Sequence, residues 1–360
     1  MSWNFRWLGI GVLAVSMSVA GCGGDGADLS AGGSTPSTGA PVNFDEVVSV
    51  DTRSDLAYYQ IQDQAEALLK AGKFDEIETL ASQYRQSQET IPSGMWKLAG
   101  VYLGVAEVDE KASNAEWEKR VEKISQWTKS RPKSVTARVA LARCYHDGAY
   151  RSRGMGWGSG VKENQWKEMY ARLDKGARVL ADSTAMRKQC PGWYAAAQRI
   201  AALENRPQKE FDAITDEALQ LFPAYEDFHF FRAKQLLPRW GGSKDAWQKY
   251  AAQVANEKGG EAGDALYARI IWSLQKYAGS ETLDELDGFD WPRAKRGFEV
   301  IGKGPDPFAS ANAFARVAWL ADDRETASSL FQSPIGTHAD FSVWWNREEF
   351  KKARRWALQG

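Results

Sequence analysis

Apolar residues recur at three- and four-residue spacing along most of the chain from about residue 55 onward. Side chains at this spacing share one face of an α-helix. Leu56 to Lys70 predicts one helix, Ala71 to Lys73 a turn, and Phe74 to Tyr84 a second helix that runs back. The two-residue alternation that marks strands is nearly absent. The pattern therefore predicts an all-α protein built of helical hairpins.

The stretch from Leu236 to Ser243 indicates how one hairpin is joined to the next. Pro238 is expected to end the preceding helix because proline lacks the backbone N–H that a helix interior uses. Gly241 and Gly242 allow a tight turn, and Ser243 is a residue type that caps a following helix. Similar punctuation elsewhere predicts a succession of antiparallel helix pairs.

Large and small residues also recur at fixed helical offsets. The pattern is seen at Trp96, Ala99, Gly100 and Leu103, and again at Trp193, Ala196, Ala197 and Ile200. Small residues let a neighbouring helix approach and large ones fill the adjacent gap, so stacked pairs bury a continuous core. These residues and the turn within Leu68 to Ile77 resemble tetratricopeptide-type arrays over roughly residues 55 to 330. The resemblance implies an α-solenoid of antiparallel hairpins with irregular repeat spacing.

Two further stretches carry a second resemblance. The glycine-rich loop that begins at Arg151 and the turn Leu236–Ser243 are similar to those of an uncharacterised bacterial family of tetratricopeptide-like proteins. That family has no assigned activity that could be transferred to this chain. The resemblance therefore supports the fold and leaves the function open.

The first residues have the layout of a targeting segment. Arg6 is the only charge before the apolar stretch Trp7 to Val19, which is short for a membrane-spanning helix. Val19-Ala20-Gly21-Cys22 then resembles the lipobox of bacterial lipoproteins, although Val19 stands where that family prefers Leu. The resemblance implies that Cys22 becomes an acylated N-terminus; cleavage of an ordinary signal peptide nearby is the alternative.

The chain is accordingly divided into three parts. We expect a lipoprotein signal peptide at residues 1–21, a flexible tether rich in Gly, Ser and Pro at 22–50, and a helical-repeat domain at 51–360. Acyl chains on Cys22 would hold the protein on a membrane, because each buried methylene contributes about 0.8 kcal/mol. Gly23 after the cysteine favours the outer membrane of a two-membrane cell envelope, by analogy with lipoproteins.

One predicted hairpin has a longer and more glycine-rich loop than a stacked helix pair needs, from Arg151 to Gly160. Insertions of this kind lie on one face of a solenoid, often the binding face. Arg151, Arg153 and Trp157 are residue types that binding sites favour, and Arg239 and Trp240 repeat the pair. They are candidates for a shared site that takes an anionic or sugar-like ligand. The alternative is architectural: the arginines cap carbonyls and the tryptophan fills a gap.

Composition and motifs exclude several classes of function. Lys and Arg number 46 against 47 Asp and Glu, and they are interleaved, so no nucleic-acid-binding surface is indicated. The three His residues, His146, His229 and His338, are far apart and outside metal-binding spacings, which leaves no metal or cofactor motif. The nucleophile elbow of hydrolases is missing. Among the many Asp and Glu residues, the sequence alone singles out no catalytic carboxylate.

Two cysteines lie outside the tether, Cys144 and Cys190. In an oxidising compartment they could form a disulfide between neighbouring helices, worth about 3–4 kcal/mol in the chain-entropy model. Both sit in apolar helical contexts, where a free cysteine acts as a small hydrophobic residue. The sequence does not decide between these two states.

The C-terminal stretch from Asn346 to Leu358 predicts a basic amphipathic helix. A terminal repeat needs a polar outer face, so this helix is expected to cap the array. Contact with anionic lipid is the alternative.

Three functions are carried forward from the sequence. The first is a lipid-anchored cell-envelope protein that acts as a non-catalytic scaffold for envelope protein partners. The second is an envelope module that binds a sugar or peptidoglycan fragment through the Arg and Trp loops. The third is a hydrolase that depends on Asp or Glu, for which perturbed carboxylates gathered in one place would be the sign.

Overall fold

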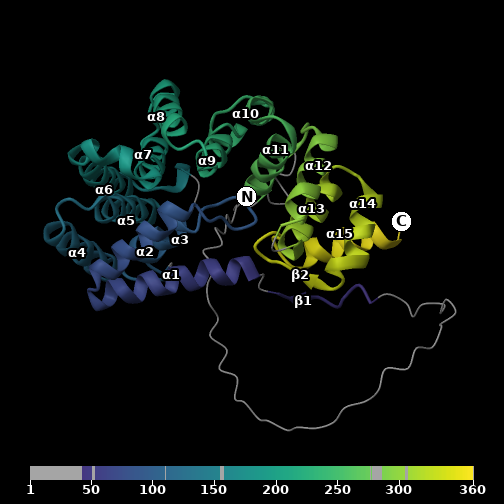
Figure 1. Cartoon of the computed structure of the whole chain (residues 1–360), viewed down its shortest axis with the longest axis horizontal. Helices are drawn as coiled ribbons and strands as arrows, with labels where there is room; N and C mark the ends of the chain where they lie inside the picture. The colour runs from purple at the N-terminus through teal and green to yellow at the C-terminus, as the bar shows by residue number, and fades with distance from the viewer. Residues whose placement is uncertain are drawn as a thin grey trace, which may run out of the picture.

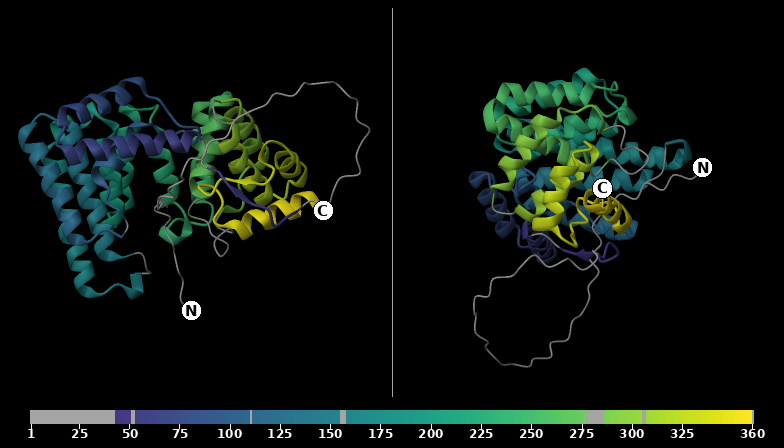
Figure 2. Two further views of the ribbon diagram at one scale, coloured as in Figure 1. Left: turned by 90° about the horizontal axis from the view of Figure 1, so that it is seen from below. Right: turned by 90° about the vertical axis from the view of Figure 1, so that its right-hand side faces the viewer.

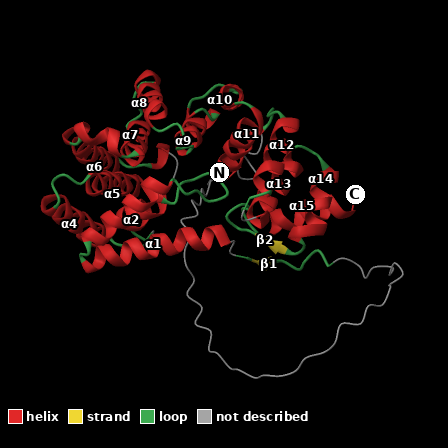
Figure 3. Cartoon of the chain, viewed as in Figure 1, coloured by secondary structure: helices red, strands yellow, loops and turns green. Residues whose placement is uncertain are grey.

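The computed structural model describes residues 43–50, 53–109, 111–154, 158–275, 277, 286–304 and 307–359. Over these residues the chain is all-α, as predicted, and its helices pack mainly on helices that follow or precede them in sequence. Figures 1 and 3 show the helices following one another along a curved path, from α1 to α8 on one side, through α9 to α11, to α12 to α15 on the other. The helical-repeat prediction is confirmed.

The helices of the first half are α1 (Arg53–Ala71), α2 (Phe74–Ser87), α3 (Leu98–Ala106), α4 (Asn114–Ser130), α5 (Val135–Arg153), α6 (Glu163–Asp182), α7 (Pro191–Leu203) and α8 (Gln208–Leu221). The second half holds α9 (Asp227–Gln235), α10 (Ala246–Lys258), α11 (Gly260–Gln275), α12 (Trp291–Gly302), α13 (Pro307–Leu320), α14 (Arg324–Leu330) and α15 (Arg347–Gln359). Shorter elements are η1 (Gly158–Gly160), η2 (Thr184–Gln189), η3 (Pro238–Trp240), η5 (Phe331–Ile335), β1 (Val48–Ser49) and β2 (His338–Ala339).

The predicted turns hold with one change. Gly72, at φ +73°, closes the α1–α2 hairpin, where glycine avoids the strain of a left-handed backbone. Helix α9 ends before Pro238, which instead begins η3. Ser243 is not the cap of α10: that position is Asp245, and the Ser243 hydroxyl donates to its Oδ1 at 3.1 Å. The turn simply runs two residues further than the cap rule suggests.

The hydrophobic core has two main parts. One gathers buried residues from Ile61 to Phe228, and the other gathers buried residues from Ala233 to Ala357. Both parts include residues of α9, which therefore lies where the two cores meet. Large aromatic side chains such as Trp127, Trp247 and Trp344 are fully buried, so at least these tryptophans serve the core.

A buried carboxylate links the two halves beside α9. Glu226 is 6% exposed, and its oxygens accept from Lys258 at 2.6 Å and from Arg269 at 3.2 Å. Arg269 also donates to the carbonyl of Pro92, in the loop that joins α2 to α3. Trp96 of the same loop donates to the carbonyl of Ala224 at 3.0 Å. Segments far apart in sequence are thereby held against the start of α9.

The folded body begins earlier than the predicted boundary at residue 51. Strand β1 pairs in parallel with β2, with Val48 opposite His338. Arg354 of α15 donates to the carbonyls of Asn43 and Glu46, and Arg347 donates to that of Val47. Figures 1 and 2 show β1 running beside the C-terminal helix. Residues 43–50 therefore belong to the folded body, because the C-terminal helix supplies partners that local sequence does not reveal.

We expect Glu226→Gln to weaken the packing between the two halves, because Glu226 pairs with Lys258 and Arg269. The change leaves two cations facing a neutral amide, and because Arg269 and Lys258 remain partly exposed we expect a loss of about 2 kcal/mol in unfolding free energy. Urea denaturation measures it. Glu89→Gln is the matched control, since it removes an exposed pair with Lys97 that is worth about 0.5 kcal/mol. Equal losses in the two variants would contradict the assigned role of Glu226.

Candidate binding site

Helix α5 packs against several other helices of the first half. It packs on α3, α4, α6 and α7, and small residues such as Ala137 and Ala140 let these neighbours approach. The Ser134 side chain caps its start by accepting from the backbone N–H of Ala137 at 2.8 Å. One stripe of the helix is nevertheless polar. It consists of Arg143, His146, Asp147 and Tyr150, at the offsets that place side chains on one face.

A close contact near the end of α5 fixes the helix between α4 and α6. The indole of Trp117 covers Gly148, where a Cβ would lie 2.2 Å from the ring. Trp117 Nε1 donates to the carbonyl of Cys144 at 2.9 Å, and the Arg172 guanidinium stacks 3.9 Å from the ring centroid. Arg172 also donates to the carbonyl of Gly148 at 2.8 Å. This packing sets the rotation of α5 and so the direction of its polar stripe.

Cations from three helices converge on His146. Burial, and then the positive charges of Arg199 on α7, Arg143 on α5 and Lys234 on α9, lower the pKa of His146 to about 3. The ring is neutral at physiological pH, in a positive local potential. We call Arg143, His146, Arg199 and Lys234 the inner cluster.

Two cations of the inner cluster, Arg143 and Arg199, have few acidic partners among the described residues. Arg143 pairs with Glu107 at 3.4 Å, a long contact for a charged pair. Within the described part of the chain, Arg199 makes no ion pair and instead stacks on Phe231, 5.1 Å from its ring centroid. Burial and the charges of Glu107 and Asp227 raise the pKa of Tyr58, while the charges of Arg143 and Arg199 lower it. Glu107 and Asp227 therefore act at Tyr58, whereas the charges that act on His146 are all positive.

Aromatic rings surround the ammonium group of Lys234. Its Nζ lies 5.2 Å from the ring centroid of Phe231, 4.8 Å from that of Trp240 and 4.9 Å from that of Tyr277. The residue is 9% exposed. Cation–π attraction of this kind keeps a charge stable away from water. It holds Lys234 in place beside α5.

Asp147 is the perturbed carboxylate of the site. Burial, followed by the charge of Glu107, raises its pKa to about 7, while Arg151 and Arg143 act in the opposite direction. Its Oδ2 is buried and accepts no hydrogen bond from the described residues. At neutral pH the group is therefore close to half protonated and has an oxygen open to a new partner.

The two arginines of the predicted loop, Arg151 and Arg153, donate hydrogen bonds to backbone carbonyls of the protein. Arg151 donates to the carbonyls of Asp109 and Ala112. Arg153 donates to the carbonyl of Gly154 at 3.1 Å and stacks on Trp166 at 5.5 Å. These contacts agree with the architectural alternative. Trp157, like Cys22 and the lipobox, lies outside the described residues.

The second predicted pair behaves similarly. Arg239 donates to the carbonyl of Tyr277 and stacks on Trp240, 5.2 Å from its ring centroid. Trp240 keeps 38% of its surface exposed, which is high for so large a side chain. Burial raises the pKa of Tyr150 at the end of the α5 stripe; the charge of Arg153 lowers it and the phenol of Tyr277 adds to the rise.

Cys144 and Cys190 are both free and buried. The sulfur of Cys190 lies 3.0 Å from the hydroxyl of Tyr102. Cys144 sits on α5 beneath Trp117, and burial raises the pKa of its thiol far above its usual value. The structure therefore shows the two residues as separate packed thiols.

Sequence reasoning missed the inner cluster. The only signal was local: four polar residues at helical spacing in the middle of α5. Nothing local placed Arg199 and Lys234 beside them, because these residues come from α7 and α9. Among the described residues no group of His, Cys, Asp and Glu could hold a metal ion. No helix in the described ranges combines the length and the apolar character that crossing a membrane requires.

Comparison with known proteins gives one match. The model of DUF4034, a domain of unknown function, matches residues 61–210, the segment that contains α5 and α7. This match over part of the chain is consistent with the resemblance to an uncharacterised family. The comparison with curated proteins found no match, and neither did the comparison with solved structures.

We expect Asp147→Asn to change the pH dependence of stability. Between about pH 4 and pH 7 the unfolded state releases the proton of Asp147 while the folded state keeps it, so wild-type stability falls as pH rises. Asn cannot ionise. Its advantage over wild type should therefore grow by about 1–3 kcal/mol across this range and then level off. The lowered pKa of His146 makes its own contribution to stability rise with pH. This contribution is the same in both proteins and cancels in the difference.

Urea unfolding of both proteins over this pH range tests the prediction. A difference in unfolding free energy that stays constant with pH would show that the folded-state pKa of Asp147 is not raised.

Proposed function

We propose that this protein is a lipid-anchored component of the bacterial cell envelope whose helical-repeat body binds an acidic ligand at the inner cluster. The ligand class that fits best is a carboxylate-bearing fragment of peptidoglycan. The observation that carries the proposal is that Arg199 and Lys234 lie 5.1 and 5.2 Å from the centroid of one ring, Phe231, and that both act with Arg143 to lower the pKa of His146. Anchoring through Cys22, on the periplasmic side of the outer membrane, rests on the lipobox resemblance.

Charge supports binding of an anion. Holding cations together where two of them, Arg143 and Lys234, are buried is costly unless a counter-charge is present. Glu107 contacts only Arg143, at 3.4 Å, and Arg199 has no acidic partner among the described residues. A ligand carboxylate beside Arg199 would supply the missing charge through a short, two-pronged hydrogen bond.

Aromatic and hydroxyl groups support a sugar-like or peptide-like ligand. Tyr150 lies at the end of the α5 stripe, and Phe231 lies under Arg199. Apolar faces of sugars pack on such rings. When protonated, Asp147 can donate a hydrogen bond to a ligand oxygen, which an ionised carboxylate cannot do.

We favour this ligand-binding role over the protein scaffold that the sequence suggested first. Helical repeats suit a scaffold equally well, but a scaffold does not call for several cations acting on one histidine.

A second candidate is a hydrolase in which Asp147 acts as a general acid. The raised pKa of Asp147 and the nearby Glu107 favour it, because a general acid must hold its proton near neutral pH. In that case the ligand would be a substrate. Turnover that Asp147→Asn abolishes, without loss of ligand affinity, would distinguish this candidate from simple binding.

We expect Arg199→Gln to lower the affinity for an acidic muropeptide at least tenfold, because a charged hydrogen bond to a carboxylate is worth about 1.5–3 kcal/mol. Isothermal titration calorimetry with a disaccharide tripeptide measures the change. Arg178→Gln is the control: it removes an equal charge from the exposed face of α6, where Arg178 pairs with Asp174 at 2.7 Å. Equal affinities for wild type and Arg199→Gln, or no binding by wild type, would refute the proposal.

A further inference from the structure

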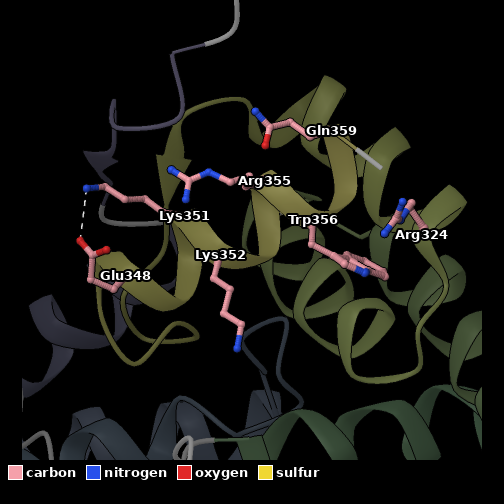
Figure 4. A pocket seen from close by; sticks show the side chains of 7 residues that line it. All are labelled: Arg324, Glu348, Lys351, Lys352, Arg355, Trp356 and Gln359. Carbon is pink, nitrogen blue, oxygen red and sulfur yellow. Dashed lines mark hydrogen bonds and ion pairs between the residues drawn. The ribbon is translucent and has the colours of Figure 1, made fainter.

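A second cationic surface lies far from the inner cluster, on the C-terminal cap. It surrounds an open hollow of about 550 Å³ formed by α15 and the start of α14. The side chains that matter here are Arg324, Glu348, Lys351, Lys352, Arg355 and Trp356. Figure 4 shows them along the outer side of α15, with Arg324 facing Trp356. We call this surface the cap hollow.

The cap hollow has an excess of positive charge. Four cationic side chains face a single carboxylate, Glu348, which is engaged by Lys351 at 3.2 Å. Arg324, Lys352 and Arg355 are exposed and make no ion pair with any described residue. These three cations are therefore open to an external anion.

The free cations rest on aromatic rings instead. Arg324 lies 5.1 Å from the ring centroid of Trp356, and Arg355 lies 5.8 Å from that of Phe44. Lys352 lies 5.8 Å from the ring centroid of Trp319. A partly buried tryptophan within a cationic surface is the side-chain combination found where proteins meet membrane headgroups.

The chain enters the folded body at the same place. The carbonyl of Asn43 accepts from Arg354 at 3.1 Å, and Phe44 lies under both Arg354 and Arg355. Arg354 is 6% exposed, so this contact belongs to the packed body. The segment that leads back to Cys22 therefore departs from the edge of the cap hollow.

Covalent geometry limits how far the body can be from its anchor. Residues 23–42 lie between the lipidated cysteine and Asn43, and at about 3.5 Å per residue they span at most about 70 Å. A surface next to the attachment point reaches the membrane more often than any other part of the body, because tethering raises its local concentration there.

We propose that the cap hollow docks on the headgroups of anionic phospholipid in the membrane that carries the anchor. Arg324, Lys352 and Arg355 contact the phosphates, and Trp356 enters the interfacial layer. Docking would orient the helical body on the membrane. The inference rests on the proposed lipid anchor, but it is independent of the ligand at the inner cluster.

The test uses the mature chain with Cys22→Ser, so that lipid does not hold it on the vesicle. We expect it to float with vesicles of equal parts phosphatidylglycerol and phosphatidylcholine, and not with pure phosphatidylcholine. The triple variant Arg324→Gln, Lys352→Gln, Arg355→Gln should lose at least tenfold in affinity, since each cation near an anionic surface contributes about fivefold. Added salt should weaken the binding of the unmodified surface.

The control removes the same charge elsewhere. Lys70, Arg178 and Lys249 are exposed cations on α1, α6 and α10, and their triple change to Gln should alter affinity less than twofold. Equal loss in the two triple variants, or flotation that does not depend on phosphatidylglycerol, would overturn the proposal. Fatty-acid labelling of the wild-type chain tests the anchor separately, so failure of the anchor and failure of the docking surface are distinguishable.

Discussion

The burial of helix α5 is the constraint on which the rest of the site depends. Four neighbouring helices cover α5 and leave a single polar stripe, and the contact of Trp117 with Gly148 sets the rotation of that stripe. A helix packed in this way does not leave Arg143 or His146 fully exposed: Arg143 is buried and His146 is partly buried. Helices α7 and α9 bring Arg199 and Lys234 to the same place, and the free energy of packing holds the charges together.

The position of α9 joins this site to the second half of the molecule. Helix α9 takes part in both hydrophobic cores, and Glu226 at its start is held by Lys258 and Arg269. Lys234 of the same helix is held by the rings of Phe231, Trp240 and Tyr277. The site therefore draws on both halves, whereas the DUF4034 match covers the first half and ends before α9. Any function of the inner cluster would then require the chain beyond the matched domain.

Much of the fold, and little of the site, could be predicted from the sequence. Helical periodicity and the turn at Gly72 gave α1 and α2 nearly to the residue, because both are local properties. The loop arginines were candidates by residue type alone, and Arg151 proved to bind backbone carbonyls. Arg199 was missed because α7 and α5 meet through tertiary packing, which no local sequence pattern reveals. The docking of residues 43–50 on α15 was missed for the same reason: pairing across the whole chain leaves no local pattern.

The pKa of His146 tests the central claim most directly. The chain has only three histidines, so the ring signals can be assigned in an NMR titration by single substitution. The account predicts a pKa far below the usual 6.5 in the free protein, rising when an acidic muropeptide binds and neutralises the surrounding cations. A normal pKa in the free protein, or a lowered pKa that the bound ligand leaves unchanged, would contradict it.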